Sequence, residues 1–121
     1  MGMMRTLGAS LVSAEAGRVV IEAPVTPAVT QQHGFGHAAL TFAIGDSAAG
    51  YAALTTMPEG SEVLTAEIKI NLLAPARGPV LRAEGRVVRP GRRLVVVTAE
   101  VTDEKGAVAL LQGTMIPAAP A

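Results

Sequence analysis

The segment from residue 38 to residue 58 constrains the fold most, because its one charged side chain, Asp46, stands among alanine, glycine and other small residues. Alanine is the strongest helix former, and one set of residues recurs at the spacing of a helix face. We therefore predict a helix from Ala38 to about Leu54. Two glycines inside it lower its intrinsic propensity, so burial by the rest of the chain must hold it. The residues at helical spacing are Leu40, Ala43, Ile44, Ser47, Ala48 and Tyr51.

A segment of this length and low charge also raises the question of a membrane helix. Its small residues, its central acid and its lack of basic flanks would drive insertion only weakly. The N-terminal residues lack the apolar core and the cleavage pattern of a signal peptide. We therefore predict a buried helix in a cytoplasmic protein.

Strand patterns stand on both sides of the predicted helix. Two short apolar runs within residues 10–25 are divided near Gly17 and predict a hairpin. After the helix, residues 61–75 alternate between polar and apolar side chains, as expected of a sheet with one buried face. In this alternation Glu67, Lys69 and Asn71 stand against Ala66, Ile68, Ile70 and Leu72.

Three further strand patterns follow, in residues 79–91, 92–106 and 107–117, with turn signals between them. We therefore predict an α+β fold that forms a single domain over residues 1–121. Its parts are a hairpin, one central helix and an antiparallel meander. A single buried helix is covered only if the sheet wraps around it.

The overall charge excludes several kinds of partner. Ten basic and ten acidic side chains cancel, which removes the electrostatic footprint of a protein that holds nucleic acid or an anionic membrane through net charge. The chain has no cysteine, so it has neither a thiolate nucleophile nor a thiolate zinc site. Half of its residues are hydrophobic, which is more than one small monomer would bury and favours an oligomer.

Two histidines, His33 and His37, have a spacing that also occurs in metal sites. Gly34 and Gly36 lie between them, and no Asp or Glu stands near enough in the sequence to complete a site. We therefore predict no metal site.

The residues around the helix start resemble those of a known family. Gln31 is followed by Gly34, by the triplet His37-Ala38-Ala39 and by the pair Asp46-Ser47. The hotdog-fold acyl-CoA thioesterases of the phenylacetate-degradation type have an Asn, a Gly, a His-Gly-Gly triplet and an acid at the same spacing. The stretches INLLAPARGP and GRVVRPGRRLVVVTAEVTDEKGAVALLQGTMI are similar to later strands of that family. The resemblance implies a hotdog fold, an antiparallel curved sheet wrapped around one central helix.

The resemblance also implies roles for the matching residues. Asp46 is expected to activate water or to attack the thioester itself, across a dimer interface from the partner's loop. Its apolar neighbours should leave the carboxylate poorly hydrated, as either role requires. The N–H of Ala38, at the helix start, is expected to bind the oxygen that becomes negative during attack. Thr65 is expected to assist through its hydroxyl, and Gln31, in place of the Asn, to orient the substrate or the lytic water.

Several of these residues also have a purely structural interpretation. An isolated Asp in an apolar helix can bond to a neighbouring backbone group or to a facing Arg, and Thr65 is an ordinary strand residue. His37 is expected to anchor the loop through a backbone hydrogen bond rather than to act as the base. Together with Ala39 and Leu72, His37 is predicted to contact the substrate.

A basic cluster lies at a predicted turn between two strands and comprises Arg89, Gly91, Arg92 and Arg93. The phosphates of CoA require guanidinium or backbone donors, which this turn can supply. Arg77 is a further candidate. The alternative is a solvated hairpin end, because runs of charge are usually solvated. We predict that this turn contacts the CoA phosphates.

These features predict an acyl-CoA thioester hydrolase that needs no cofactor, since CoA is part of the substrate. The chain is expected to form a homodimer and, beyond it, a homotetramer, with no nucleic acid or membrane partner. The alternative is a non-catalytic acyl-CoA-binding protein of the same fold, which the departures at Gln31 and Ala38-Ala39 permit. A hydratase of this fold would show an Asp and His pair at positions other than Asp46 and His37, and the sequence lacks such a pair. Only three residues are aromatic, which favours an acyl pocket with aliphatic walls.

Overall fold

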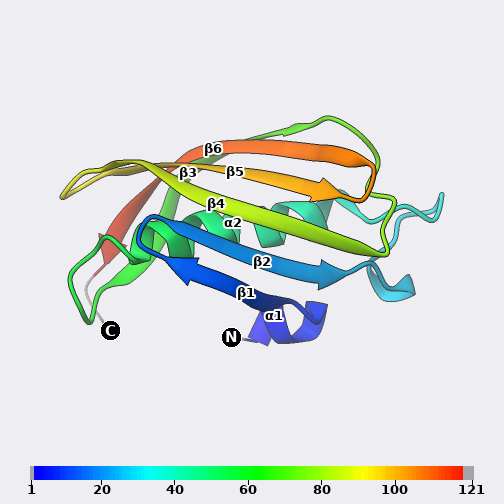
Figure 1. Ribbon diagram of the computed structural model, residues 1–121, viewed down its shortest axis with the longest axis horizontal. Coiled ribbons are helices and arrows are strands. Elements are labelled where there is room, and N and C mark those ends of the chain that lie inside the picture. The colour runs from blue at the N-terminus through cyan, green and yellow to red at the C-terminus, as the bar shows by residue number, and fades with distance from the viewer. Residues whose placement is uncertain (1, 119–121) are drawn as a thin grey trace.

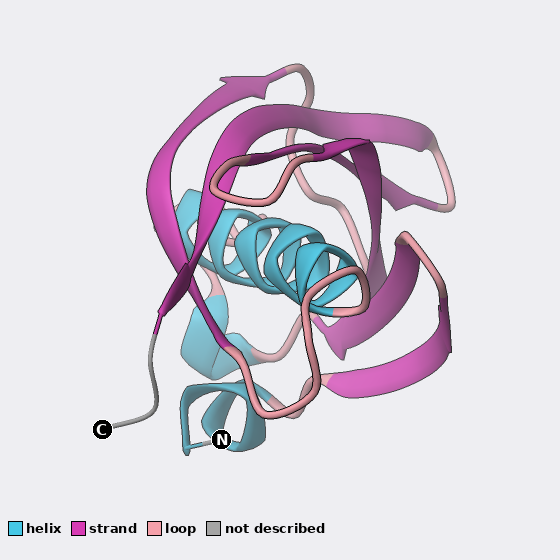
Figure 2. Cartoon of the chain, turned by 90° about the vertical axis from the view of Figure 1, so that its left-hand side faces the viewer, coloured by secondary structure: helices cyan, strands magenta, loops and turns pink. Residues whose placement is uncertain are grey.

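The computed structural model describes residues 2–118, which form one curved antiparallel sheet and one long helix (Figure 1). The elements, in chain order, are α1 (Gly2–Leu7), β1 (Ser10–Glu15), β2 (Arg18–Pro24), the short 3-10 helix η1 (Pro27–Val29), α2 (Ala38–Leu54), β3 (Glu62–Leu72), β4 (Val80–Pro90), β5 (Val95–Asp103) and β6 (Gly106–Ala118). The strands lie in the order β1-β2-β4-β5-β6-β3. Figure 2 shows the sheet curving around α2. The predicted α+β architecture, a curved sheet wrapped around one central helix, is confirmed.

The central helix α2 has the predicted bounds. Its side chains Leu40 and Ile44 are almost fully buried against the sheet. Gly45 belongs to the same interface, because a β-carbon added there would lie 2.8 Å from a methyl carbon of Leu111. Burial therefore holds the helix, as its glycine content requires. Among the described residues, no helix is both long enough and apolar enough to cross a membrane.

Helix α2 and strand β4 approach one another closely at Gly85. A β-carbon added there would lie 2.3 Å from the backbone carbonyl oxygen of Ala48. The obstacle is backbone rather than a flexible side chain, so glycine lets the strand reach the helix at this point. This contact fixes α2 against the sheet, and with it the position of Asp46 two residues earlier in the helix.

The strand order corrects part of the predicted meander. Strands β4, β5 and β6 are successive neighbours as expected, but β3 pairs with β6 rather than with β4. Residues 73–79 carry the chain from β3 to β4 past the glycine-rich loop, where the N–H of Gly36 donates to the carbonyl of Ala76 at 2.8 Å. A strand's own alternation does not specify its neighbour, because pairing depends on residues far away in the sequence. The sequence patterns also did not predict α1.

A bulge in β3 corrects the predicted alternation. Thr65 pairs with Met115 and Glu67 pairs with Thr114, so Ala66 is an extra residue between the two pairs. Strict alternation places Ala66 on the buried face and Thr65 beside Glu67 on the polar face, but Ala66 is exposed. The extra residue changes which side chains face inward. As a result, Thr65 turns towards α2, opposite the fully buried Met115.

Replacing Gly85 tests the close packing of helix and sheet. We expect Gly85→Ala to lower the free energy of unfolding by roughly 3 kcal/mol or more, because the methyl group forces the backbones of β4 and α2 apart. Urea unfolding of the two proteins, followed by circular dichroism, measures the difference.

Gly50→Ala is the matched control, because a β-carbon there has no heavy atom of another element nearer than 4.0 Å. Alanine is the better helix former, so this variant should be neutral or more stable by up to about 1 kcal/mol. An unfolding midpoint of Gly85→Ala equal to that of the wild type would contradict the packing account.

Candidate active site

The glycine-rich loop, residues 31–37, brings the chain to the start of α2. Within it the N–H of Gln31 donates to the carbonyl of Phe35 at 2.8 Å, and the N–H of Gly34 donates back to the carbonyl of Gln31 at 3.0 Å. Gly34 has a φ of 85°, which favours glycine. The N–H of His37 donates to the carbonyl of Val29 at 2.8 Å and ties the end of the loop to η1. These bonds fix the direction in which the helix begins.

His37 caps the helix start and leaves one backbone donor exposed. Its Nδ1 atom accepts a hydrogen bond from the N–H of Ala39 at 2.9 Å. The N–H of Ala38, the first residue of α2, has no acceptor within the helix, because the first turn lacks a preceding carbonyl. Ala38 is exposed. The available donor at this helix start is therefore the Ala38 N–H, since the cap already occupies that of Ala39.

A cavity of about 560 Å³, which we call the loop cavity, opens beside this donor. Four predicted site residues line it, and we call them the helix-start group: Gln31, His37, Ala38 and Leu72. Gln31 also uses its side-chain oxygen within the loop, where it accepts from the N–H of His33. None of the lining residues carries a carboxylate, a guanidinium or an ammonium group. The remaining lining residues are Phe35, Gly36, Thr41, Leu73, Ala74, Pro75, Ala76 and Val108.

Asp46 and Thr65 lie together on the flank of α2 that faces β3, and we call them the carboxylate pair. The Thr65 hydroxyl donates to Asp46 Oδ1 at 2.8 Å, and its oxygen also lies 3.3 Å from the sulfur of Met115. Asp46 is half-buried. Its second oxygen, Oδ2, has no hydrogen-bond partner among residues 2–118. One carboxylate oxygen is therefore held, and the other is available to a ligand or to water.

The helix-start group and the carboxylate pair are separate within one chain. Asp46 follows Ala38 by eight residues, which corresponds to a rise of about 12 Å along an α-helix. A backbone donor and a base that act on the same carbonyl must both lie within hydrogen-bonding reach of it or of one water. One chain therefore presents two half-sites.

Arg77 lies near the loop cavity and is held by Asp103. The Arg77 N–H donates to Asp103 Oδ2 at 2.9 Å, and the Arg77 guanidinium stands 5.7 Å from the centre of the Phe35 ring. Partial burial acts to raise the pKa of Asp103, but the backbone N–H groups of Arg77, Lys105 and Gly106 outweigh it and lower that pKa below its ordinary value. The ionised Asp103 thus ties the turn between β5 and β6 to residues 73–79.

The basic cluster, Arg89, Gly91, Arg92 and Arg93, lies at the β4–β5 turn, at the opposite end of the sheet from the glycine-rich loop (Figure 1). A row of paired residues runs from this turn across the sheet: Pro90, Val95, Met115 and Thr65. The turn therefore lies at the end of the sheet that carries the carboxylate pair. The three arginines are exposed, and no salt bridge joins them to another residue within the described range 2–118.

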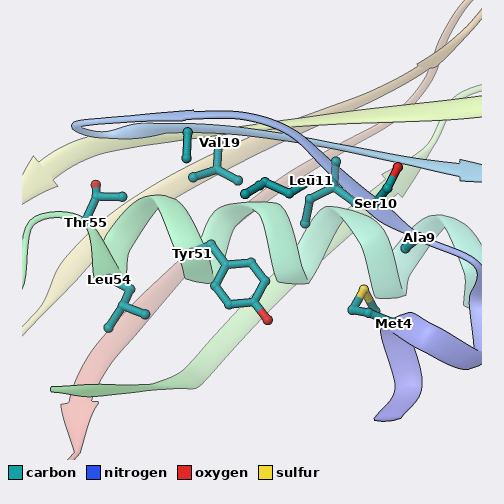
Figure 3. Close-up of a pocket in the computed structure, with 10 residues that line it drawn as sticks. Met4, Ala9, Ser10, Leu11, Val19, Tyr51, Leu54 and Thr55 are labelled. Atoms are coloured by element: carbon teal, nitrogen blue, oxygen red, sulfur yellow. The ribbon is translucent and has the colours of Figure 1, made fainter. Parts of the chain in front are cut away.

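A second cavity, of about 440 Å³, lies between α1, the first hairpin and the C-terminal half of α2. Figure 3 shows the ring of Tyr51 and the side chain of Leu54 on the helix side of it. Its walls are largely apolar, and none of the predicted site residues lines it. It has no free helix-start donor, so we place the candidate site at the loop cavity and the carboxylate pair.

Sequence reasoning missed Thr41, Phe35 and Asp103 as possible contributors to the site. Thr41 lies one turn into α2 and lines the loop cavity with Phe35. The signal for Thr41 was its helical spacing from Ala38, which places the two on adjacent parts of one helix face. Asp103 has no local signal, because its contact with Arg77 joins residues 26 positions apart.

Comparison with known proteins identifies the family. The model of the Thioesterase superfamily matches residues 33–110. The chain belongs to this superfamily. A solved thioesterase family protein from Silicibacter pomeroyi is 40% identical, with a TM-score of 0.94 over 99% of this chain and 91% of that one. The 1,4-dihydroxy-2-naphthoyl-CoA hydrolase of Listeria monocytogenes is 29% identical over 86% of this chain and 85% of its own length.

The resemblance to the phenylacetate-degradation type also has a structural counterpart. The E. coli PaaI protein from the phenylacetic acid degradation operon superposes with a TM-score of 0.89 over 98% of this chain and 85% of that one. Their sequences are 23% identical, so this likeness supports the shared fold. The predicted superfamily and its fold are thereby confirmed, while the roles of individual residues stay predictions.

Proposed function

We propose that this member of the thioesterase superfamily hydrolyses an acyl-CoA thioester to a carboxylic acid and CoA. The observation that carries the proposal is the contact of Asp46 with Thr65, which holds one carboxylate oxygen and leaves the other available. A carboxylate in this state suits a general base or a nucleophile. The relative from Listeria, a naphthoyl-CoA hydrolase by name, supports CoA as the thiol part of the substrate.

The proposed reaction uses one donor and one carboxylate. The thioester carbonyl oxygen accepts a hydrogen bond from the Ala38 N–H, which stabilises negative charge as the carbonyl carbon is attacked. If Asp46 acts as a base, it takes a proton from water, the hydroxide oxygen bonds to carbon, and the C–S bond breaks. If Asp46 attacks directly, an anhydride forms as CoA thiolate leaves, and water then hydrolyses the anhydride. In both routes the thiolate takes up a proton to give CoA.

The proposed site is shared between two copies of the chain, because the two half-sites of one chain lie too far apart. Within residues 2–118, strand β3 has a neighbour, β6, on one side only, and its side chains Leu64 and Leu72 are more than half exposed. A long edge strand is a template for pairing with another chain. Two-fold antiparallel pairing of β3 brings the Thr65 end of one strand beside the Leu72 end of the other. The carboxylate pair of one copy then approaches the loop cavity of its partner.

The dimer is the minimal unit of this proposal, and the high hydrophobic fraction of the chain supports further assembly into a homotetramer. The basic cluster would contribute the contacts to the CoA phosphates, because its arginines lie at the carboxylate-pair end of the sheet without a salt-bridge partner among residues 2–118. Arg77 is the alternative, since its guanidinium lies near the loop cavity.

Replacing Asp46 tests the catalytic role. Asp46→Asn keeps the size of the side chain but can neither accept the proton nor attack, so turnover should fall by about 100-fold or more. The measurement is thiol release from a panel of acyl-CoAs, with the melting temperature and CoA affinity of each protein determined in parallel. Both of these properties should be retained.

Thr65→Val and Thr65→Ser are the paired controls for this experiment. Valine removes the hydroxyl that positions the carboxylate and should reduce turnover. Serine keeps the hydroxyl and should retain most of the turnover. An Asp46→Asn protein that melts normally, binds CoA and hydrolyses at the wild-type rate would remove Asp46 from the mechanism. A wild-type protein that binds acyl-CoAs but releases no thiol would support the non-catalytic binding alternative.

Replacing two arginines tests the contact with CoA. The variant Arg89→Ala/Arg92→Ala should bind CoA more weakly by about 1 to 3 kcal/mol per lost charge-assisted contact. Its affinity should also depend less steeply on salt. Isothermal titration with CoA at two salt concentrations measures both effects. Arg82→Ala is the control, because Arg82 pairs with Glu22 on neighbouring strands. Equal CoA affinity in the double variant and the wild type would exclude this turn from the phosphate site.

A further inference from the structure

Thr41 is the one polar residue that is almost completely buried among residues 2–118, with 1% of its surface exposed. Threonine inside a helix commonly donates its hydroxyl to the carbonyl four residues earlier. Here the carbonyl of His37 accepts from the backbone N–H groups of Leu40, at 2.9 Å, and Thr41, at 3.4 Å. The Thr41 hydroxyl has no hydrogen-bond partner in the described part of the chain.

Buried hydroxyl groups are nearly always hydrogen-bonded, because an unpaired one forfeits its bonds to water. Within residues 2–118, no buried side-chain oxygen or nitrogen is both sealed from solvent and unpaired. The Thr41 oxygen must therefore keep access to a space that a bonding group can enter. The candidate for that space is the loop cavity, which Thr41 lines.

Two residues of α2 line the loop cavity one turn apart: Ala38, which is exposed, and Thr41, which is buried. Three residues of α-helix correspond to a rise of about 4.5 Å, the length of a few carbon–carbon bonds. The surrounding walls include Leu73, Pro75 and Val108, and the lining has no charged side chain to bind phosphate. The cavity therefore suits the acyl part of a thioester rather than the phosphates of CoA.

We propose that the Thr41 hydroxyl determines acyl specificity by hydrogen-bonding an oxygen substituent, a hydroxyl or a keto group, that the acyl chain carries a few bonds from the thioester carbonyl. This inference rests on the proposed thioester hydrolysis and names the class of acyl group. A pocket that provides a buried hydrogen-bonding group discriminates against an analogue that lacks the matching oxygen, since that group is then left unpaired. The loop cavity accordingly favours oxygenated acyl groups over saturated ones of the same length.

The test compares butanoyl-CoA with 3-hydroxybutanoyl-CoA, which differ by one oxygen. The wild type should have the higher kcat/KM on the hydroxylated ester, by roughly tenfold. Thr41→Val keeps the shape of the side chain without the hydroxyl and should reduce this ratio to near one. Thr41→Ser keeps the hydroxyl and should retain the preference. Melting temperatures of the three proteins show whether each variant is folded.

Equal ratios of kcat/KM in the wild type and Thr41→Val would overturn the proposal. The proposal would also be overturned if Thr41→Val lowered kcat/KM by the same factor for both esters. Thr41 would then act on a part of the substrate that the two esters share. If the wild type hydrolyses neither ester, the proposed hydrolysis fails for these two substrates. Equilibrium binding of the two esters then tests the Thr41 contact separately. In that case tighter binding of the hydroxylated ester by the wild type and Thr41→Ser, but not by Thr41→Val, supports the contact, and equal binding by all three contradicts it.

Discussion

The hydrogen bond from Thr65 to Asp46 is the interaction on which the account of this site depends. It requires a carboxylate on the open flank of an otherwise apolar helix and a strand whose alternation is broken at Ala66. Without the bulge, Thr65 would share the outer face of β3 with Glu67. Bulges often re-aim a side chain near functional sites. Here the bulge supplies a fixed donor to one oxygen of Asp46 and leaves the other oxygen open, a state in which the carboxylate can take part in chemistry.

The distance between Asp46 and the Ala38 N–H also limits how the site can be assembled. Both groups lie on the same rigid helix, so no loop movement in one chain brings them together. The capping hydrogen bond from the Ala39 N–H to His37 occupies one backbone donor at the helix start. The Ala38 N–H is therefore the donor that remains available. In the proposed dimer, a second copy paired through the edge strand β3 supplies the missing half of each site. The proposed mechanism therefore links activity to assembly.

The sequence predicted the parts that depend on local pattern and missed those that depend on distant contacts. Helical spacing and small residues predicted α2 from Ala38 to about Leu54, which the structure confirms, and alternation predicted the long strands. The pairing of β3 with β6 and the bulge at Ala66 have no local signal. Alternation alone would have turned Thr65 away from the helix, and only the family resemblance predicted that Thr65 belongs to the site. Thr41 looks like an ordinary helix-face residue until the cavity beside it and its missing hydrogen bond are known.

The most direct test of a shared site combines two inactive variants. Ala38→Pro removes the N–H donor at a position where proline is tolerated, and the preceding His37 already has the extended conformation that proline requires (ψ 143°). Asp46→Asn removes the carboxylate chemistry. After co-refolding of equal amounts, a dimer with one copy of each variant has one site with both defects and one with neither. Thiol release should recover to about one quarter of the wild-type rate, since about half of the dimers are mixed. A mixture that stays as inactive as the separate variants would contradict the account.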